Sequence, residues 1–337
     1  MIENEDVPAT QTTIAYSRYG APEVLAPLDR PVPRPGEGEL LVRVAAAGVN
    51  PADYALRSGR FRLYMRGRLP FVPGSDVAGV VAAVGPGVTA HRPGDAVYAM
   101  LPLFTGGGYA PYAVVPQDLA APAPAGLSLA EAAAMPLAAL TALQALRDKA
   151  GVSPGASVLV HGASGGVGHF AVQVAKRLGA RVTGVTSGRN AGFVTGLGAD
   201  AVVDYQREDP VAAGPFDVVF DAVAEFGVRR SRRALRPGGV AVTVVPGIDA
   251  LFPDRLAWMR GGRRLRSVLV QPSGADLREL AAWAGDGGVR PVVEATFPLV
   301  EGATAHVTAE KRRVRGKLVL VVDPELAARV PGGIAHT

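Results

Sequence analysis

The sequence predicts an α/β protein in which an all-β, barrel-like unit is joined to a doubly wound parallel sheet. Two patterns along the 337 residues predict this fold. Up to about residue 125, short alternating strands are separated by glycine and proline turns, which is typical of an all-β unit. From about residue 155, buried strands alternate with helical segments, which is the pattern of a parallel sheet with crossover helices. At roughly 150 residues per domain, the chain has room for both units.

The first region alternates apolar and polar residues in the way that half-buried strands require. The strand-like stretches lie at 39–45, 76–81 and 95–99, and the turns lie at 35–38, 85–87, 92–95 and 106–108. Strand-like character returns after residue 292 and ends in the apolar run 317–322, so we expect the tail to rejoin this unit.

The second region contains six strand candidates and five helix candidates in alternation. The strands are expected at 157–161, 181–186, 201–205, 216–223, 240–245 and 266–270. The helices are expected at 168–178, 191–197, 228–235, 250–259 and 275–284. We therefore expect a catalytic domain over 1–125, completed by 292–337, and a nucleotide-binding domain over 126–291.

The composition is that of a globular protein, because 48% of the residues are hydrophobic and 19% are charged. The chain has no cysteine, which excludes disulfides, cysteine-ligated zinc and a thiol nucleophile. The net charge of +5 is weak evidence for a polyanionic partner. Residues 1–13 are acidic where a signal peptide would be basic, so we expect a cytoplasmic protein. The apolar segment 126–146 is interrupted by Glu131 and Pro136, so we expect a buried helix and no membrane partner.

The strongest local motif is a glycine-rich turn between the apolar strand 157–161 and the helix expected from 168. Glycines there permit a tight turn and a close approach of a pyrophosphate, and the helix supplies oriented N–H groups. The sequence therefore predicts dinucleotide binding. The expected contacts are Gly162, Ser164, Gly165, Gly166 and Val167.

The end of the second strand of this region favours NADPH over NADH. An enzyme that uses NADH usually carries an acidic residue there, but none occurs between 178 and 199. Ser187 and Arg189 stand there instead, and a hydroxyl and a guanidinium suit a phosphate. The alternative is that both residues cap and solvate the next helix. Tyr205, at the end of the third strand, is expected to flank the adenosine or to be an edge tyrosine.

Several further motifs stand in a specific order. The chain resembles the medium-chain dehydrogenase/reductase superfamily, and within it the zinc-free quinone oxidoreductase-like branch. The matching segments are 47–53, 73–81, 92–95, 107–110 and 161–168. The resemblance implies a GroES-like β-barrel domain built from the amino-terminal part plus the tail, a Rossmann domain between them, an active-site cleft at their junction and a homodimer paired through the edge strand at 266–270.

The resemblance also implies chemistry without a metal. Zinc alcohol dehydrogenases of the superfamily carry a cysteine where Asn50 stands, and His-Glu where Ser75 and Asp76 stand. The five histidines show no paired spacing that would replace these ligands. Without a Lewis acid, hydride transfer from NADPH needs an acceptor that is already electrophilic, such as a quinone or an enone.

Three residues match functional positions of the superfamily. Asn50 is expected to donate to the acceptor carbonyl or to hold the nicotinamide ribose, or else to fix the Asn50-Pro51 turn. Thr141 matches a position near the nicotinamide amide, and its alternative role is to bond to its own helix. Lys317 matches a basic residue near the pyrophosphate, and its alternative is surface solvation.

The proton donor is less defined. Related enoyl reductases often place a tyrosine where this chain has Phe61, which leaves Tyr54, Tyr64 or solvent as the donor. Residues 57–71 interleave five arginines with aromatic residues. This segment is expected to line an apolar substrate cleft with an anion-binding rim, to bind single-stranded nucleic acid, or to be a solvated loop with one apolar anchor.

The sequence thus favours a zinc-independent, NADPH-dependent reductase of quinones or enones, with a small-molecule substrate. A second hypothesis is an enoyl-thioester reductase in a biosynthetic tailoring pathway, for which the arginines of the 57–71 segment would contact phosphates or a carrier. A third is a catalytically silent NADPH-binding protein with an RNA or protein partner.

Overall fold

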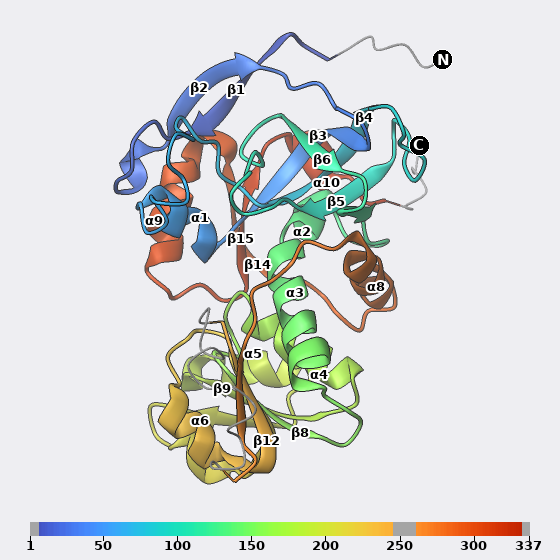
Figure 1. Ribbon diagram of the computed structural model, residues 1–337. Helices are drawn as coiled ribbons and strands as arrows, with labels where there is room; N and C mark the ends of the chain where they lie inside the picture. Colours follow the sequence, from blue (N-terminus) through green and yellow to red (C-terminus); the bar gives the residue numbers. More distant parts are fainter. Residues whose placement is uncertain (1–6, 245–260, 332–337) are drawn as a thin grey trace. The chain divides into compact units, whose positions relative to one another are not determined.

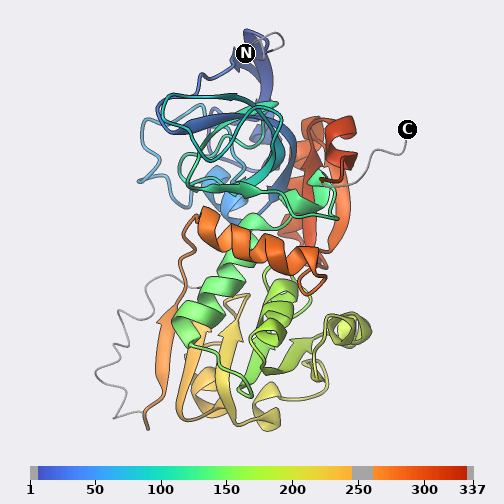
Figure 2. The same ribbon diagram turned by 90° about the vertical axis from the view of Figure 1, so that its right-hand side faces the viewer.

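The structure is a computed structural model, and it describes residues 7–244 and 261–331. The chain divides into two compact units, which are described separately (Figures 1 and 2). Unit 1 comprises Met1–Leu137, Pro272–Gly287 and Pro291–Thr337. Unit 2 comprises Ala138–Gln271 and Gly288–Arg290. The helix expected at 250–259 lies outside the described residues.

Unit 1 is built on a seven-stranded sheet in the order β14-β15-β3-β4-β5-β7, with β6 paired to β3, and a separate β1–β2 pair. The strands are β1 Thr10–Ala15, β2 Ala26–Pro31, β3 Glu39–Val49, β4 Asp76–Val84, β5 Ala96–Met100, β6 Tyr112–Pro116, β7 Ala120–Pro122, β14 Val293–Pro298 and β15 Lys317–Val321. The long strand β3 organises the unit, because it pairs antiparallel with β4, β6 and, near its carboxyl end, β15 of the tail.

Five α-helices belong to unit 1 among its described residues: α1 Pro51–Arg57, α2 Leu129–Ala133, α8 Gly274–Gly285, α9 Gly302–Glu310 and α10 Pro324–Ala328. Helix α8 groups with unit 1 because its first residue, Gly274, lies directly on β7 and the turn before it. A Cβ on Gly274 would lie 2.4 Å from the carbonyl oxygen of Asp118, so only glycine permits this contact.

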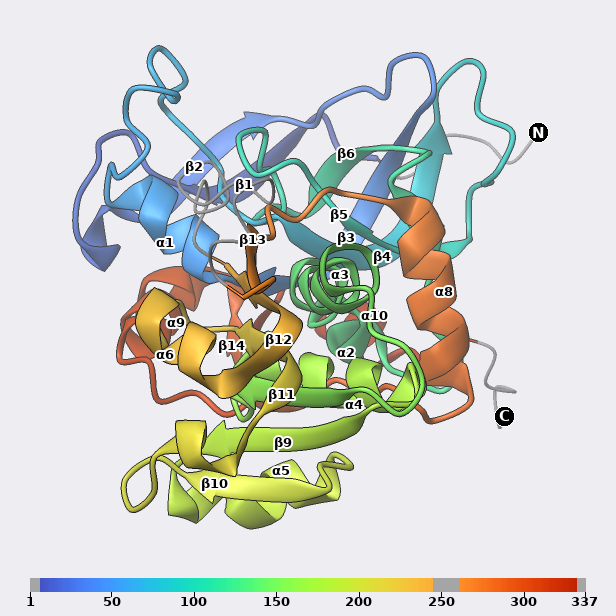
Figure 3. The same cartoon turned by 60° about the horizontal axis from the view of Figure 1, so that its bottom comes forward.

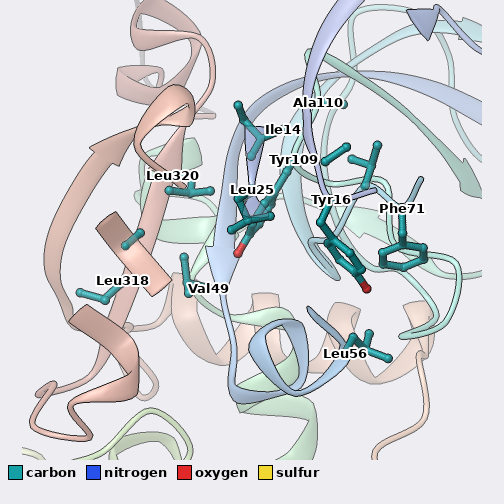
Figure 4. Packing of buried hydrophobic residues seen from close by; sticks show 14 of the residues in the cluster. Ile14, Tyr16, Leu25, Val49, Leu56, Phe71, Tyr109, Ala110, Leu318 and Leu320 are labelled. Atoms are coloured by element: carbon teal, nitrogen blue, oxygen red, sulfur yellow. The ribbon is translucent and has the colours of Figure 1, made fainter. Parts of the chain in front are cut away.

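The core of unit 1 joins segments that are far apart in the sequence. Figure 4 shows Tyr16 and Phe71 packed beside Tyr109, with Leu318 and Leu320 of the tail in the same cluster. The ring of Tyr109 passes over Gly74, where a Cβ would lie 2.5 Å from the ring. The first strands, the loop before β4 and the tail therefore share one core.

Unit 2 contains a six-stranded parallel sheet in the order β10-β9-β8-β11-β12-β13. The strands are β8 Ser157–His161, β9 Arg181–Thr186, β10 Ala201–Asp204, β11 Phe216–Asp221, β12 Leu235–Thr243 and β13 Arg264–Ser267. The helices α4 Gly168–Arg177 and α5 Ala191–Gly196 pack against β8, β9 and β10, and α6 Val228–Ala234 packs against β11 and β12 (Figure 3). In order of the chain this is 3-2-1-4-5-6, which confirms the predicted doubly wound sheet.

The apolar segment 126–146 is not the single helix that the sequence suggested. It forms α2, then α3 (Pro136–Leu143), and then a π-helical turn, η2 (Gln144–Ala150). Pro136 lacks an N–H and cannot continue the helix before it, so a new helix begins at this residue. Among residues 7–244 and 261–331, no helix is long and apolar enough to cross a membrane.

Candidate active site

Three adjacent strands of unit 1 bring Asn50, Asp76 and Lys317 together. Asn50 follows β3, Asp76 begins β4 and Lys317 begins β15, and the antiparallel pairing aligns these three strand ends. The Lys317 Nζ donates to Asn50 Oδ1 and, at 3.2 Å, to the carbonyl oxygen of Val49. It also lies 3.4 Å from Asp76 Oδ2, to which Asn50 Nδ2 donates at 2.9 Å. We call these three side chains the Asn50–Asp76–Lys317 cluster.

The cluster is a buried ion pair with an amide between the charges. Its three residues are at most 3% exposed, so both charges depend on one another and on the hydrogen bonds around them. The N–H of Leu137 donates to Asp76 Oδ1 at 2.7 Å. The glycine at position 48 leaves space for the Asp76 side chain, because a Cβ there would lie 2.8 Å from Asp76 Oδ2. The orientation of the Asn50 amide is fixed, since Lys317 bonds its oxygen and Asp76 bonds its nitrogen.

This donor set does not fit a zinc ion. The positions that hold ligands in zinc alcohol dehydrogenases are Asn50, Ser75 and Asp76 here, and they supply one carboxylate and no imidazole or thiolate. Both oxygens of that carboxylate already accept hydrogen bonds, and the Lys317 ammonium lies beside it. Within the part of the chain that the structure describes, no group of three or more potential metal ligands occurs.

Asp53 fixes the start of helix α1. Its Oδ2 accepts from the N–H of Asn50 at 2.9 Å, and its Oδ1 accepts from the N–H of Gly74 at 3.2 Å. Burial, with the nearby carboxylate of Asp76, raises the pKa of Asp53 to about 7. The carboxyl therefore ties Asn50 and the loop before β4 to one another, and it exchanges a proton near neutral pH.

We expect Asp53 to make the protein less stable as the pH rises. Its pKa is higher in the folded state than its ordinary value of 3.8, so folding binds a proton between these two values. The free energy of unfolding therefore loses the contribution of this group as the pH rises from about 4 through about 7. Urea unfolding of the wild type and of Asp53→Asn at a series of pH values measures this. The variant should lack that decline, whereas the control Asp29→Asn, at an exposed position, should retain it. Parallel curves for wild type and Asp53→Asn would refute the assignment.

Tyr54 lies outside the Asn50–Asp76–Lys317 cluster. It lines a pocket of about 480 Å³ in unit 1 together with Arg57, Glu310 and Arg312. Its ring packs edge-on against His306 at 6.3 Å between centroids, and burial raises the pKa of its hydroxyl. The structure thus brings Asn50 and Lys317 together. Tyr54 lines a separate pocket, although it lies on α1, the helix that Asn50 caps.

The glycine turn of unit 2 has the geometry of a nucleotide-binding loop. Gly162 has a φ of +78°, and a Cβ there would lie 2.6 Å from Val223. A Cβ on Gly168 would lie 1.9 Å from the carbonyl oxygen of Gly162, which also accepts from the N–H of Gly165 at 3.0 Å. A Cβ on Gly165 would meet nothing closer than 3.4 Å, so the chain leaves that face of the turn open. Helix α4 begins at Gly168 with Val167 as its N-cap residue, and Gly166 lies within the turn. These residues fit a bound pyrophosphate.

The end of β9 is tied to the glycine turn through Ser164. Its Oγ accepts from Thr186 Oγ1 at 2.9 Å and from Asn190 Nδ2 at 3.2 Å. Ser187 precedes the short helix η3 (Gly188–Asn190) without a side-chain capping bond, and Arg189 is exposed on it. Ser187 thus does not cap this helix through its side chain, whereas the exposure of Arg189 agrees with the alternative that it solvates the helix face.

Three acidic residues of the two units were not identified as site candidates from the sequence. Asp76 is one, although a charge that opens an apolar strand is a visible signal. Asp204 ends β10, and a Cβ on Gly188 would lie 2.6 Å from its Oδ2. Asp221 ends β11 and bonds His161 Nδ1 at 3.0 Å across the ends of β8 and β11. Burial opposes the charge of Asp221, but hydrogen bonds from His161 and Phe226 lower its pKa.

Asp221 and His161 lie where the strand order of unit 2 reverses, which is the usual ligand crevice of such sheets. Two other residues were predicted to contact the cofactor. Tyr205 follows β10 and is 55% exposed, and Thr141 is buried in α3.

Two family models match the chain. One is described as an alcohol dehydrogenase GroES-like domain and matches residues 36–125, and one is described as a zinc-binding dehydrogenase and matches residues 197–320. The second range does not contain Asn50, Ser75 or Asp76.

Relatives match over nearly the whole chain. A chloroplast envelope quinone oxidoreductase homolog of Arabidopsis thaliana is 34% identical over 321 residues, which cover 91% of this chain and 97% of that relative. A 2-methylene-furan-3-one reductase of Solanum lycopersicum is 34% identical over 326 residues, which cover 93% of this chain and 80% of that relative. The solved structure of the quinone oxidoreductase from Coxiella burnetii has a TM-score of 0.85 and 35% identity, and covers 93% of this chain and 99% of that one.

Proposed function

We propose a function for this chain from the premise that it belongs to the medium-chain dehydrogenase/reductase superfamily. In this proposal it is a zinc-independent oxidoreductase. It transfers a hydride from NADPH to a quinone or to an α,β-unsaturated carbonyl compound. The observation that carries the proposal is the Asn50–Asp76–Lys317 cluster. An ammonium group already neutralises the carboxylate that a metal would need. The acceptor must then be electrophilic without a Lewis acid, as quinones and enones are.

The cofactor supplies the reducing chemistry when it is bound, because reduced nicotinamide donates the hydride. We assign the pyrophosphate to the glycine turn, Gly162 to Gly168. This role is supported by the close contacts that an added Cβ would make at Gly162 and Gly168, and by the open face of the turn at Gly165. We assign the adenosine to the neighbourhood of Tyr205 and the nicotinamide amide to Thr141. Unit 2 thus serves as the nucleotide-binding domain in this proposal, and unit 1 serves the acceptor.

Asn50 is assigned to the acceptor oxygen or to the nicotinamide ribose. Lys317 Nζ donates to Asn50 Oδ1, and Asn50 Nδ2 uses one of its two hydrogens to donate to Asp76. The second Nδ2 hydrogen is therefore the one that we assign to the ligand. Lys317 is a positioning residue in this account rather than a pyrophosphate ligand, since its Nζ is buried against Asn50. Tyr54 lines another pocket, and burial raises the pKa of its hydroxyl and so makes it a weaker acid; we therefore assign proton supply to solvent, with Tyr54 as the alternative.

The preference for NADPH is assigned to Ser187 and Arg189, and it is tested at Arg189. We expect Arg189→Ala to raise the Kd for NADPH about 10- to 100-fold, because a hydrogen bond to a charged group is lost. The Kd for NADH should stay the same. Fluorescence titration with both nucleotides measures this.

The matched control for this titration is Arg181→Ala, at the other end of β9, which should leave both Kd values unchanged. Asp204 lies beside Gly188 and would suit the ribose hydroxyl of NADH instead. If the wild type binds NADH more tightly than NADPH, the assignment to Arg189 is wrong.

The acceptor class is tested by following the absorbance of NADPH with a benzoquinone, phenanthrenequinone, a medium-chain enone and crotonyl-CoA. We expect turnover with the quinones or with the enone. Turnover with crotonyl-CoA alone would favour the enoyl-thioester reductase. Tight NADPH binding without any turnover would favour the catalytically silent protein.

We also propose a homodimer in the cytoplasm. Strand β13 pairs only with β12 among the described strands, which leaves an edge for a second copy. Light scattering that shows only monomer at micromolar concentration would exclude the dimer.

A further inference from the structure

One surface of unit 1 is apolar at its tip and basic around it. Leu63 is 83% exposed and Tyr64 is 73% exposed, which are the highest values for large apolar side chains in the described residues. Phe104, at 38%, contacts the ring of Tyr64 at 6.1 Å between centroids. The arginine–aromatic surface, as we call it, consists of these three residues with Arg60, Arg62, Arg66 and Arg68. All of them except Phe104 belong to the light-blue segment that follows α1 in Figure 3.

The exposure of Leu63 and Tyr64 does not come from a loose loop. Met65, the next residue, is fully buried in the core of unit 1. The N–H groups of Tyr64 and Met65 both donate to the carbonyl oxygen of Phe61. Arg68 Nη1 donates to the carbonyl oxygen of Phe104 at 2.8 Å, which joins the two loops. The structure therefore holds the two apolar side chains outward at a cost in solvation, and such exposure marks an interaction site.

The charge around this tip has one sign. The four arginines are exposed, and none makes an ion pair with a residue that the structure describes. Neither 57–75 nor 101–117, the two segments that build the surface, contains an acidic residue. Arg68 and Phe104 also line a pocket of about 480 Å³ with Arg30, and its lining has no acidic side chain. A partner at this surface must present several anionic groups around an apolar region.

We propose that the arginine–aromatic surface docks on the surface of a bilayer that contains anionic phospholipid. Phosphates of the headgroups pair with the arginines, whose planar guanidinium groups suit phosphate. Tyr64 lies at the level of the headgroups, and Leu63 enters the acyl region. Leu63 at the tip favours a bilayer over single-stranded RNA, because an aliphatic side chain offers no plane on which a base stacks.

This contact is peripheral and differs from the membrane span that the sequence argues against. It does not depend on the proposed reaction. Vesicle binding needs neither cofactor nor acceptor, so its failure and a failure of the hydride-transfer assay are separate results.

The test is flotation of the full chain with vesicles of phosphatidylcholine alone and with vesicles of equal parts phosphatidylcholine and phosphatidylglycerol. We expect binding to the anionic vesicles only, and release by salt. Arg62→Gln with Arg66→Gln should weaken binding about 25-fold, since each basic residue contributes about fivefold. Leu63→Ser with Tyr64→Ser should weaken it about 10-fold or more, because apolar burial is lost.

Matched controls take equally exposed residues elsewhere. Val300→Ser replaces an apolar side chain that is 70% exposed, and Arg229→Gln with Arg233→Gln removes two exposed arginines of α6. Both controls should bind as the wild type does. The proposal is overturned if the wild type does not float with anionic vesicles, or if the controls weaken binding as much as the test variants. It is also overturned if a single-stranded RNA oligonucleotide binds more tightly than the vesicles, or if Leu63→Ser with Tyr64→Ser converts a dimer to a monomer.

Discussion

Replacing Gly168 by alanine is expected to weaken NADPH binding strongly and to destabilise unit 2. The added Cβ would lie 1.9 Å from the carbonyl oxygen of Gly162 and 2.9 Å from the Cα of Ala163, and neither backbone atom is free to rotate away. We expect the Kd for NADPH to rise about 100-fold or more, because the turn and the start of α4 must separate by about an ångström. The free energy of unfolding should fall by about 1–3 kcal/mol, as for other overpacked sites.

Gly192→Ala is the matched control for this substitution. Gly192 lies in α5 of the same unit, and a Cβ there would meet no atom within 4 Å. Alanine should leave the Kd for NADPH unchanged and should stabilise the helix by up to about 1 kcal/mol. Fluorescence titration and thermal unfolding measure both variants. If Gly168→Ala binds NADPH as tightly as Gly192→Ala does, the glycine turn does not hold the pyrophosphate.

The second large effect is expected at Lys317. Lys317→Met leaves the carboxylate of Asp76 buried without its cation and leaves the Asn50 oxygen without a donor. We expect the free energy of unfolding to fall by about 3–5 kcal/mol, which is typical when one partner of a buried ion pair is removed. Urea unfolding measures this loss, and the rate of acceptor reduction should fall with it because Asn50 is no longer oriented.

Lys176→Met is the control for a lysine pair at the surface. Lys176 pairs with Asp200 at 2.8 Å, but both side chains are more than a third exposed. Its loss should lower the free energy of unfolding by at most about 1 kcal/mol.

Adding Asp76→Asn to Lys317→Met removes the unpaired charge and should recover part of the stability. Equal losses at Lys176 and Lys317, or no recovery in the double variant, would contradict the buried ion pair.

The fold could be predicted from local patterns in the sequence, because each pattern is contained in a short segment. The alternation of buried strands and helices after residue 155 predicted the parallel sheet, and the glycine turn marked its first crossover. The segment 126–146 was read as one helix although Pro136 was noted in it, because the sequence does not show whether a proline kinks a helix or begins a new one. Helix α8 groups with unit 1 through a contact at Gly274, which no local pattern reveals.

The candidate site was less accessible from the sequence, because its contacts join residues that are far apart. Asn50 was identified by its position in a motif. Its partners Asp76 and Lys317 lie 26 and 267 residues away, and only the pairing of β3 with β4 and β15 brings them to it. Lys317 was expected beside the pyrophosphate because it matches a basic position of the superfamily, whereas its Nζ lies against Asn50. A lysine that opens the apolar strand LVLV is the signal from which a buried charge could have been inferred.

The proposed reaction is hydride transfer from NADPH to a quinone without a metal. The most direct measurement is the rate of NADPH oxidation with a benzoquinone by chelator-treated protein whose zinc content is determined by mass spectrometry. We expect an undiminished rate at a zinc content far below one ion per chain. A rate that disappears with the chelator and returns in proportion to added zinc would contradict it.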